Sequence, residues 1–325
     1  MKSAAEFKSF YDSELLPSLN ILEEDRKKLV NGGFKWAAIG LIPFAISLAI
    51  NKGNVIEASW FVLFAGVILC GGLYLILNLR KIKEIKDRFK NEVIAKMVKA
   101  IDPSLQYQAS GHIASYDYHK SKLYLQDINR YKGDDLVMGR VGQTAIRFSE
   151  LLTEMETTKT DSKGNKSKQI TTIFKGLFFV GDFNKNFKGE TIVLPDTAES
   201  IFGSIGTMFQ KWNFQRDQLV KLEDVEFEKA FAVYSNDQIE ARYILSTSLM
   251  QRILQFKAKT KKGMRMSFIG NEVFIAVPLS ENLFEAPFFS SMAKYERIEG
   301  FNKYLVLFIG IVEDLNLNTR IWTKE

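Results

Sequence analysis

Two long uncharged apolar runs near the N-terminal end most constrain what this chain can fold into. Residues 36–51 hold no Asp, Glu, Lys or Arg, and residues 58–79 form a second such run. At about 1.5 Å per residue, the second run makes a helix about 33 Å long, enough to cross a hydrocarbon core of about 30 Å. The first run is about 24 Å long, so it spans a bilayer only if the two residues before Lys35 join it and the Lys35 ammonium group reaches the interface. The sequence predicts a two-span transmembrane hairpin over residues 34–79.

The alternative is that both runs are buried helices of a soluble protein. Such helices usually carry a polar stripe, which these runs lack. Trp36 and Trp60 stand near the ends of the runs, where interfacial aromatic residues are enriched. Pro43 predicts a kink in the first span, and Cys70 is most simply a small apolar residue of the second.

Cations flank one side of the predicted hairpin. They are Arg26, Lys27, Lys28 and Lys35 before the first run, and Arg80, Lys81, Lys83, Lys86, Arg88 and Lys90 after the second. The connection between the runs has only Lys52. The positive-inside rule then places both termini in the cytoplasm and predicts a multi-pass protein of the cytoplasmic membrane.

Amphipathic stretches adjoin both runs on the predicted cytoplasmic side. Residues 80–102 place an apolar residue at every third or fourth position, which predicts a juxtamembrane helix ending before Pro103. Residues 1–33 hold a similar, less regular stripe, which predicts an N-terminal cytoplasmic helix. Either the two stripes pack together as an antiparallel pair, the interpretation we favour, or a helix lies on anionic lipid.

Residues 103–325 have the pattern of a folded cytoplasmic α+β domain. Strand-like runs stand at Leu136–Phe148, Ile170–Phe183, Thr191–Leu194 and Val225–Tyr234, with a hairpin around Gly270–Asn271. Strands and helices do not alternate strictly, so we expect a mixed or antiparallel sheet with helices and not a doubly wound sheet. The polar segment TTKTDSKGNKSKQ fits a loop that joins two strands.

Helical periodicity is clearest in two places of this domain. One helix is predicted from Ser235, because Ser235 and Gln238 have the spacing of a capping box, and it continues after Ser246 as LMQRILQF. The other is predicted from Tyr304 to Leu317, and its apolar part of about nine residues is too short to span a bilayer.

Four pieces of the chain together resemble a known family. They are FYDSELLPSLNILEEDRKKL, IFKGLFFVGDFNKNFKGETIVLP, LEDVEFEKAFAVYSNDQIEARYILS and GNEVFIAV. The chain is similar to an uncharacterised bacterial membrane family, the domain of unknown function DUF3137. The resemblance implies a protein of the bacterial inner membrane with a domain on its cytoplasmic side, and it implies no activity, cofactor or catalytic residue.

The composition argues against several classes of site. One cysteine excludes an intramolecular disulfide framework and an iron–sulfur cluster, and two histidines leave little for metal or triad chemistry. His112 and His119 stand seven apart, a spacing that zinc sites rarely use. No phosphate-binding loop motif or nucleophile elbow occurs, so we expect no cofactor and name no catalytic residue.

The most charged constellation lies at Asp224, Glu226 and Glu228. On a strand, these three carboxylates point to one face, because side chains alternate with a period of two. A solvated sheet face is the favoured interpretation. A site for calcium or magnesium, or paired acids, is the alternative.

Downstream cations suggest structural roles first. Arg242 is expected to pair with Glu228 or Asp237 and so to lock a strand to a helix. The cluster of Lys257, Lys259, Lys261, Lys262 and Arg265 ends a predicted helix, where cations are favourable, and also suits anionic lipid. The net charge of +6 is small and no recognisable module occurs, so nucleic acid is not expected as a partner.

Two functional hypotheses follow. The first is a non-catalytic, membrane-anchored interaction or scaffold module that contacts the lipid bilayer and a cytoplasmic or membrane protein, or a second copy of itself. The segment LFEAPFFSSM, with Phe284, Phe288 and Phe289, is either an anchor for such a partner or part of the core, and burial is favoured. The second is a membrane-tethered hydrolase or cation-dependent enzyme that uses Asp224, Glu226 and Glu228.

Overall fold

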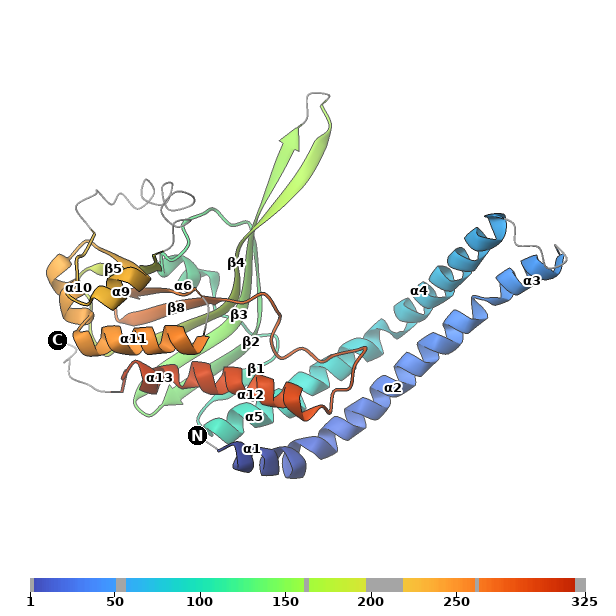
Figure 1. Cartoon of the computed structure of the whole chain (residues 1–325), viewed down its shortest axis with the longest axis horizontal. Coiled ribbons are helices and arrows are strands. Elements are labelled where there is room, and N and C mark those ends of the chain that lie inside the picture. Colours follow the sequence, from blue (N-terminus) through green and yellow to red (C-terminus); the bar gives the residue numbers. More distant parts are fainter. Residues whose placement is uncertain (1–2, 51–56, 161–163, 197–218, 261–262, 319–325) are drawn as a thin grey trace. The chain divides into compact units, whose positions relative to one another are not determined.

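The computed structural model of this chain divides into two compact units. It describes residues 3–50, 57–160, 164–196, 219–260 and 263–318. The first unit joins Met1–Met97 with Phe284–Phe301, and the second joins Val98–Leu283 with Asn302–Glu325. As the sequence predicts, the fold is α+β, with N-terminal helices followed by an eight-stranded antiparallel sheet with helices (Figure 1).

The first unit contains two long helical segments. Along the chain they are α1 (Ala4–Phe10), a π-helical turn (Tyr11–Leu15), α2 (Leu16–Ile39) and α3 (Ile42–Ile50), then α4 (Glu57–Arg88), a second π-helical turn (Phe89–Ile94) and α5 (Ala95–Ile101). Pro17 lies in the first turn of α2, directly after the π-helical turn. Near Pro43 the predicted kink is a break, because α2 ends before Gly40 and α3 begins at Ile42.

The two amphipathic stripes pack together as an antiparallel pair, as predicted. Leu19 and Leu22 of α2 are fully buried, as are Phe89 and Val93 of the second π-helical turn. The Lys96 ammonium group donates to the Ser18 hydroxyl at 3.3 Å, and an Arg88–Asp25 ion pair at 3.2 Å joins α4 to α2. The apolar periodicity of both stretches is therefore satisfied within the protein.

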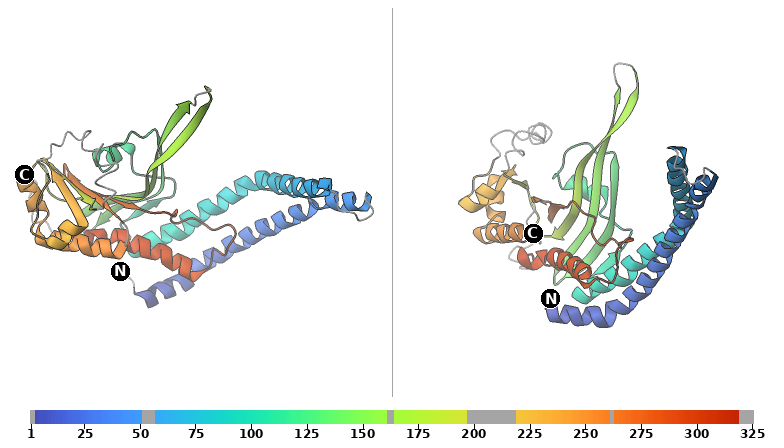
Figure 2. Two further views of the ribbon diagram at one scale, coloured as in Figure 1. Left: turned by 45° about the horizontal axis from the view of Figure 1, so that its top comes forward. Right: turned by 45° about the vertical axis from the view of Figure 1, so that its right-hand side comes forward.

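One antiparallel sheet organises the second unit. Its strands are β1 (Gln106–Gln108), β2 (Arg130–Val141), β3 (Thr144–Thr160), β4 (Lys166–Asp182), β5 (Glu190–Pro195), β6 (Phe231–Ser235), β7 (Arg265–Ile269) and β8 (Glu272–Pro278). The spatial order is β1-β2-β3-β4-β8-β7-β5-β6. The β3–β4 hairpin extends beyond the rest of the sheet (Figures 1 and 2).

Most predicted strands are present. Ile170–Phe183 and Thr191–Leu194 correspond to β4 and β5, and the hairpin at Gly270 is formed by β7 and β8, with Gly270 at a φ of +67°. Leu136–Phe148 is not one strand, because the chain turns at Gly142, where φ is +60°. The polar segment TTKTDSKGNKSKQ does join two strands, but most of it is strand and not loop, because residues 157–160 belong to β3 and pair with residues 166–169 of β4. Its residues 161–163 lie outside the described residues.

Both faces of the sheet are covered by apolar packing. On one face, Phe174 and Phe178 of β4 contact Tyr118 of α6 (Ser115–Lys120). On the opposite face, Phe148 of β3 packs on Phe179 and on Phe308 of α12 (Tyr295–Ile309). Because neighbouring residues of a strand point to opposite faces, β4 contributes aromatic side chains to both layers.

Three further sequence predictions for the C-terminal half of the chain are wrong. Val225–Ala230 is the short helix α9 and not a strand, so only Phe231–Tyr234 of the predicted strand is extended, in β6. The next helix, α10 (Gln238–Ile244), is capped by Asp237 and not by Ser235, since the Asp237 carboxylate accepts from Ile239 N and Glu240 N.

The third concerns the C-terminal helix. It begins at Tyr295, not Tyr304, and a short helix α13 (Ile311–Asp314) follows it. The predicted helix after Ser246 is present as α11 (Thr247–Thr260), and its last turn carries Lys257 and Lys259, as predicted. Lys261 and Lys262 lie outside the described residues.

Candidate functional site

A buried ion pair on α2 fixes a loop of the first unit. The Arg26 guanidinium donates to both carboxylate oxygens of Glu23, at 2.7 and 2.9 Å, and each side chain is only 9% exposed. Arg26 Nη1 also donates to the Phe288 carbonyl at 2.9 Å, and the Met292 amide donates to Glu23 Oε2 at 3.0 Å. We call the residues 284–294 that this pair holds the strap.

The ion pair perturbs the ionisation of both partners. The hydrogen bonds from Arg26 lower the pKa of Glu23, and the Met292 amide lowers it further against the opposing effect of burial. The same hydrogen bond raises the pKa of Arg26. Both groups are therefore charged at neutral pH, and each satisfies the other where water is largely excluded.

Further contacts hold both ends of the strap. Glu285 accepts from the buried Lys90 ammonium group at 2.9 Å. The Tyr11 hydroxyl donates to the Ala293 carbonyl at 2.6 Å. The Tyr11 ring packs edge-on against the Tyr295 ring, with 5.2 Å between the ring centres. The strap is thus anchored to the N-terminal helices by charged, polar and aromatic contacts.

The strap presents one aromatic side chain to solvent. Phe289 is 89% exposed, and its ring lies 5.2 Å from that of Phe288 in an edge-on arrangement. Phe284 is fully buried and packs against Phe301, which in turn contacts Phe89. The expectation that the segment is buried therefore holds for Phe284 and fails for Phe289, the residue that remains available to a partner.

The predicted hairpin carries an exposed apolar surface. Two helical segments, Ala4–Ile50 and Ser59–Ile101, are long and apolar enough to cross a membrane, and only 6% of the most apolar stretch of each is buried. Exposed side chains include Ile50 at 74%, Phe61 at 76% and Leu69 at 71%. A soluble core helix of such composition would be buried, so this surface points weakly to a membrane.

The predicted membrane-flanking residues lie on the same helices. Lys35 is exposed on α2, and Trp36 packs on Tyr74 at 6.0 Å between ring centres. Trp60 pairs with Phe44 at 6.1 Å. The other three are exposed on α4: Arg80, Lys81 and Lys83. Their interfacial role stays a prediction.

The predicted sheet face of Asp224, Glu226 and Glu228 is wrong, because Asp224 caps the helix α9 and the two glutamates lie in it. The three carboxylates have separate contacts. Asp224 caps α9 by accepting from Phe227 N at 3.0 Å, and this hydrogen bond, with one from Gln251, lowers the pKa of Asp224. Glu226 pairs with Lys229 at 3.1 Å. These are contacts that stabilise local structure.

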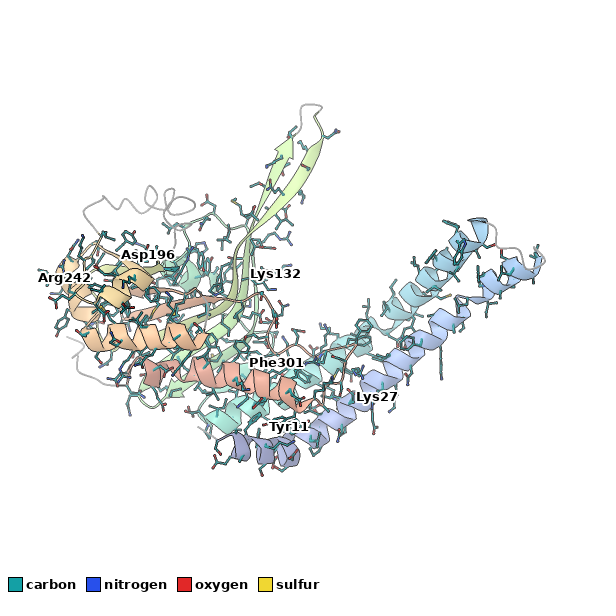
Figure 3. The ribbon with its side chains drawn as sticks, in the orientation of Figure 1. Tyr11, Lys27, Lys132, Asp196, Arg242 and Phe301 are labelled. Carbon is teal, nitrogen blue, oxygen red and sulfur yellow. The ribbon has the colours of Figure 1, made fainter. Side chains whose placement is uncertain are left out.

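Glu228 has a contact of the same kind. Its carboxylate accepts from Leu222 N at 2.8 Å, and it also lines a groove of about 370 Å³ beside β6. Arg242 pairs with neither Glu228 nor Asp237, contrary to the prediction. It donates instead to the Lys221 carbonyl and to Gln238, one turn back on the exposed face of α10 (Figure 3).

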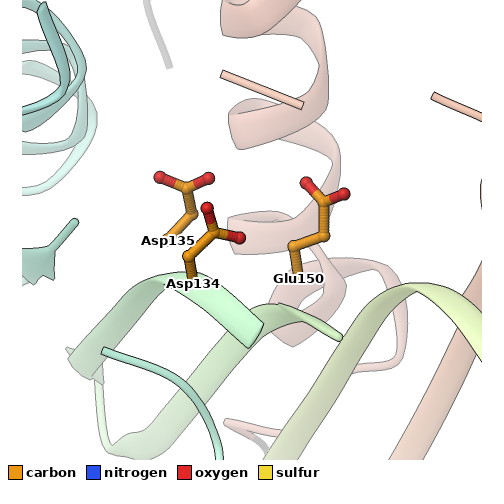
Figure 4. A group of neighbouring side chains, drawn as sticks. All are labelled: Asp134, Asp135 and Glu150. Carbon is orange, nitrogen blue, oxygen red and sulfur yellow. The ribbon is translucent and has the colours of Figure 1, made fainter. Parts of the chain in front are cut away.

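A different acidic group, not found from the sequence, lies on β2 and β3. Asp134, Asp135 and Glu150 bring one carboxylate oxygen each to within 4.8 Å of one another, the one such group among the described residues (Figure 4). Asp134 is directly opposite Glu150 in the sheet. Asp135 lies in a bulge at a φ of 59°, which turns its side chain toward the same place. Only the bulge brings these two neighbouring residues together, so sequence alternation does not reveal the group.

Hydrogen bonds offset the repulsion in this group. The Tyr107 hydroxyl donates to Asp135, and the Leu283 amide donates to Glu150 at 2.8 Å. Three carboxylates at this distance suit a divalent cation or a shared proton. The two histidines contribute nothing here: His119 bonds the Ser115 carbonyl, and His112 packs on Tyr131.

The family resemblance is confirmed for the C-terminal part of the chain. The family model described as "Protein of unknown function (DUF3137)" matches residues 172–317. This segment is similar to DUF3137. The match includes the last three of the four pieces that carry the resemblance, and it does not reach FYDSELLPSLNILEEDRKKL or the apolar hairpin.

Known proteins add little beyond this match. No curated protein matches the chain. Among solved structures, a crystal structure of the mycobacterial trehalose monomycolate transport factor A, TtfA, is similar over 68% of this chain and 96% of its own. The identity is 9% and the TM-score is 0.31, a similarity too low to carry an argument about function.

Proposed function

We propose that this chain is a two-span protein of the bacterial inner membrane, with both termini in the cytoplasm, that acts as a non-catalytic interaction or scaffold module. The exposed apolar surface of the two long helical segments carries this proposal, because such a surface is stable only against lipid or another protein. The flanking cations support the orientation.

The strap supports an interaction role. It holds Phe289 in solvent by means of a buried ion pair, and a fixed, exposed aromatic side chain is a typical anchor of a protein interface. The partner is a protein at the cytoplasmic side of the membrane, either a different protein or a second copy of this chain.

The test is photocrosslinking in cells with a light-activated amino acid at position 289. We expect a discrete protein adduct from this position. A matched control carries the same amino acid at Ile239, which is 82% exposed on α10. Equal adducts from both positions, or none from position 289, would contradict the interaction role.

The hydrolase alternative gains no support from the described residues. Asp224 is engaged as a helix cap, Glu226 in a surface ion pair and Glu228 by a backbone amide. These contacts give each carboxylate a role in the local structure, and they do not pair one carboxylate with another as a catalytic acid and base. We therefore do not propose an enzymatic activity.

A further inference from the structure

A groove of about 310 Å³ lies between α2 and α4 of the first unit, outside all the sites described above. Its floor is apolar, because Leu29 and Ile85 line it and are 7% and 6% exposed. Two exposed lysines, Lys28 and Lys81, line it from opposite helices. The groove therefore combines an apolar floor with a cation on each side.

The position of the groove along the helices places it at the end of the apolar surface. The backbones of Gly40 and Gly66 are in close contact, which shows which positions of α2 and α4 lie side by side. From Gly66 to Leu79, the end of the apolar run, is about 20 Å along α4. The same distance back from Gly40 reaches Lys27, so the groove begins where the apolar surface ends.

The charges of the groove are arranged unequally along its length. Farther from the apolar run, Arg88 is already paired with Asp25 at 3.2 Å and with Glu92 at 3.0 Å. Nearer the run, Lys28 is 3.7 Å from Asp25, and the described residues offer Lys81 no ion pair. Three cations and two carboxylates line the groove, which leaves a net charge of +1 with the less engaged cations on the side of the apolar run.

We infer that this groove binds the phosphate headgroup of one anionic phospholipid of the cytoplasmic leaflet. The inference rests on the proposed function, because it requires the hairpin to be in the membrane. Lys28 and Lys81 donate to the phosphate oxygens, as in other basic pockets between membrane helices. The acyl chains lie along the exposed apolar side chains of α4 next to the groove, Leu73, Leu75, Ile76, Leu77 and Leu79.

Native mass spectrometry of the full-length protein in detergent tests this inference. The probes are phosphatidylglycerol, phosphatidylethanolamine and inorganic phosphate, each titrated separately. The variant Lys28→Gln/Lys81→Gln removes the two groove cations. The matched control Lys27→Gln/Lys83→Gln removes the same charge from exposed residues of the same two helices that do not line the groove (Figure 3 labels Lys27).

We expect the wild-type protein to bind one phosphatidylglycerol more tightly than phosphatidylethanolamine. Loss of the groove lysines should weaken this binding about tenfold or more, and the control variant should weaken it about twofold at most. Equal weakening in both double variants would overturn the inference. Binding of inorganic phosphate as tight as that of phosphatidylglycerol would also overturn it, because the source would then be a free phosphate.

Alkaline carbonate extraction of the same membranes separates this failure from failure of the proposed function. If the protein resists extraction but its lipid binding does not depend on Lys28 and Lys81, only the lipid site is contradicted. A protein that alkaline carbonate releases is not an integral membrane protein, and that result overturns both proposals.

Discussion

Glu23 and Arg26 show how one pair of residues connects distant parts of the sequence. They are one helical turn apart on α2, yet they bond backbone groups of the strap more than 260 positions away, since Arg26 to Phe288 is a separation of 262 and Glu23 to Met292 one of 269. A buried pair of this kind adds little net stability, because the cost of removing both charges from water offsets their attraction. Its loss is costly because one unpaired charge would remain buried.

Glu23→Gln is therefore expected to destabilise the first unit by about 3 kcal/mol, because Arg26 keeps its charge and loses its carboxylate partner. Chemical unfolding of the full-length protein in detergent measures the change. Glu24→Gln, at the exposed neighbouring position, is the control and should change stability by about 0.5 kcal/mol at most. Equal effects of the two variants would show that the ion pair does not hold the strap.

Acid should release the strap for the same reason. The folded pKa of Glu23 lies below its ordinary value of 4.5, so its contribution to stability is complete above pH 4.5 and is lost as the pH falls through the lowered pKa. Hydrogen exchange of the Met292 amide, corrected for intrinsic rates, should accelerate below pH 4.5 in the wild type. In Glu23→Gln the exchange of the Met292 amide should be fast at every pH. If exchange in this variant still accelerates below pH 4.5 as in the wild type, Glu23 is not the group whose protonation releases the strap.

Asp224 distinguishes a structural from a metal-binding role at one position. Asn is as good a helix cap as Asp, whereas Ala removes the cap. Asp224→Ala should lower the thermal midpoint by roughly 2–4 °C and Asp224→Asn should leave it nearly unchanged. Thermal unfolding with and without added calcium or magnesium measures both effects. If an added cation raises the thermal midpoint of the wild type and Asp224→Asn abolishes that rise, the result would instead support a cation site at Asp224.

At the scale of elements, close backbone contact joins the two predicted spans. A Cβ atom added at Gly66 would lie 2.2 Å from the Gly40 carbonyl oxygen, and one at Gly40 would lie 2.6 Å from the Gly66 oxygen. Small residues at such crossings let membrane helices approach closely, because lipid gives no hydrophobic drive for their association.

Gly66→Ala should consequently destabilise the hairpin by about 1–3 kcal/mol, since the backbones must move apart. Gly71→Ala on the same helix is the control, because nothing lies within 4 Å of a Cβ atom there. Unfolding in detergent micelles compares the two variants. Equal stability of the two would show that α2 and α4 do not meet at Gly40 and Gly66.

Sequence patterns predicted the elements better than the contacts between them. The uncharged apolar runs predicted the hairpin helices, and strand-like patterns predicted β4, β5 and the β7–β8 hairpin. Both signals are local in the sequence. The α9 helix was missed because alternating Val225, Phe227 and Phe231 also fit a strand, while the cap at Asp224 decides for a helix. The strap and the acidic group on β2 and β3 depend on long-range pairing and a bulge, which one sequence does not encode locally.

For the whole molecule, the uneven distribution of polarity is the main result. The mean hydropathy of −0.08 averages two apolar helices with a polar α+β unit. Many of the cations behind the net charge of +6 stand next to the apolar runs, where they support a membrane orientation and line the groove between α2 and α4. Membrane anchoring is thus the central claim, and the lipid site proposed for the groove depends on it.

Cysteine accessibility in intact cells tests this claim most directly. In a Cys70→Ser background, single cysteines replace Ser3, Lys52 or Lys257, and a membrane-impermeant maleimide is applied before and after the membrane is opened. The proposed topology predicts labelling of position 52 in intact cells and of positions 3 and 257 only after opening. Labelling of position 3 or 257 in intact cells, or protection of position 52, would contradict a two-span anchor with both termini in the cytoplasm.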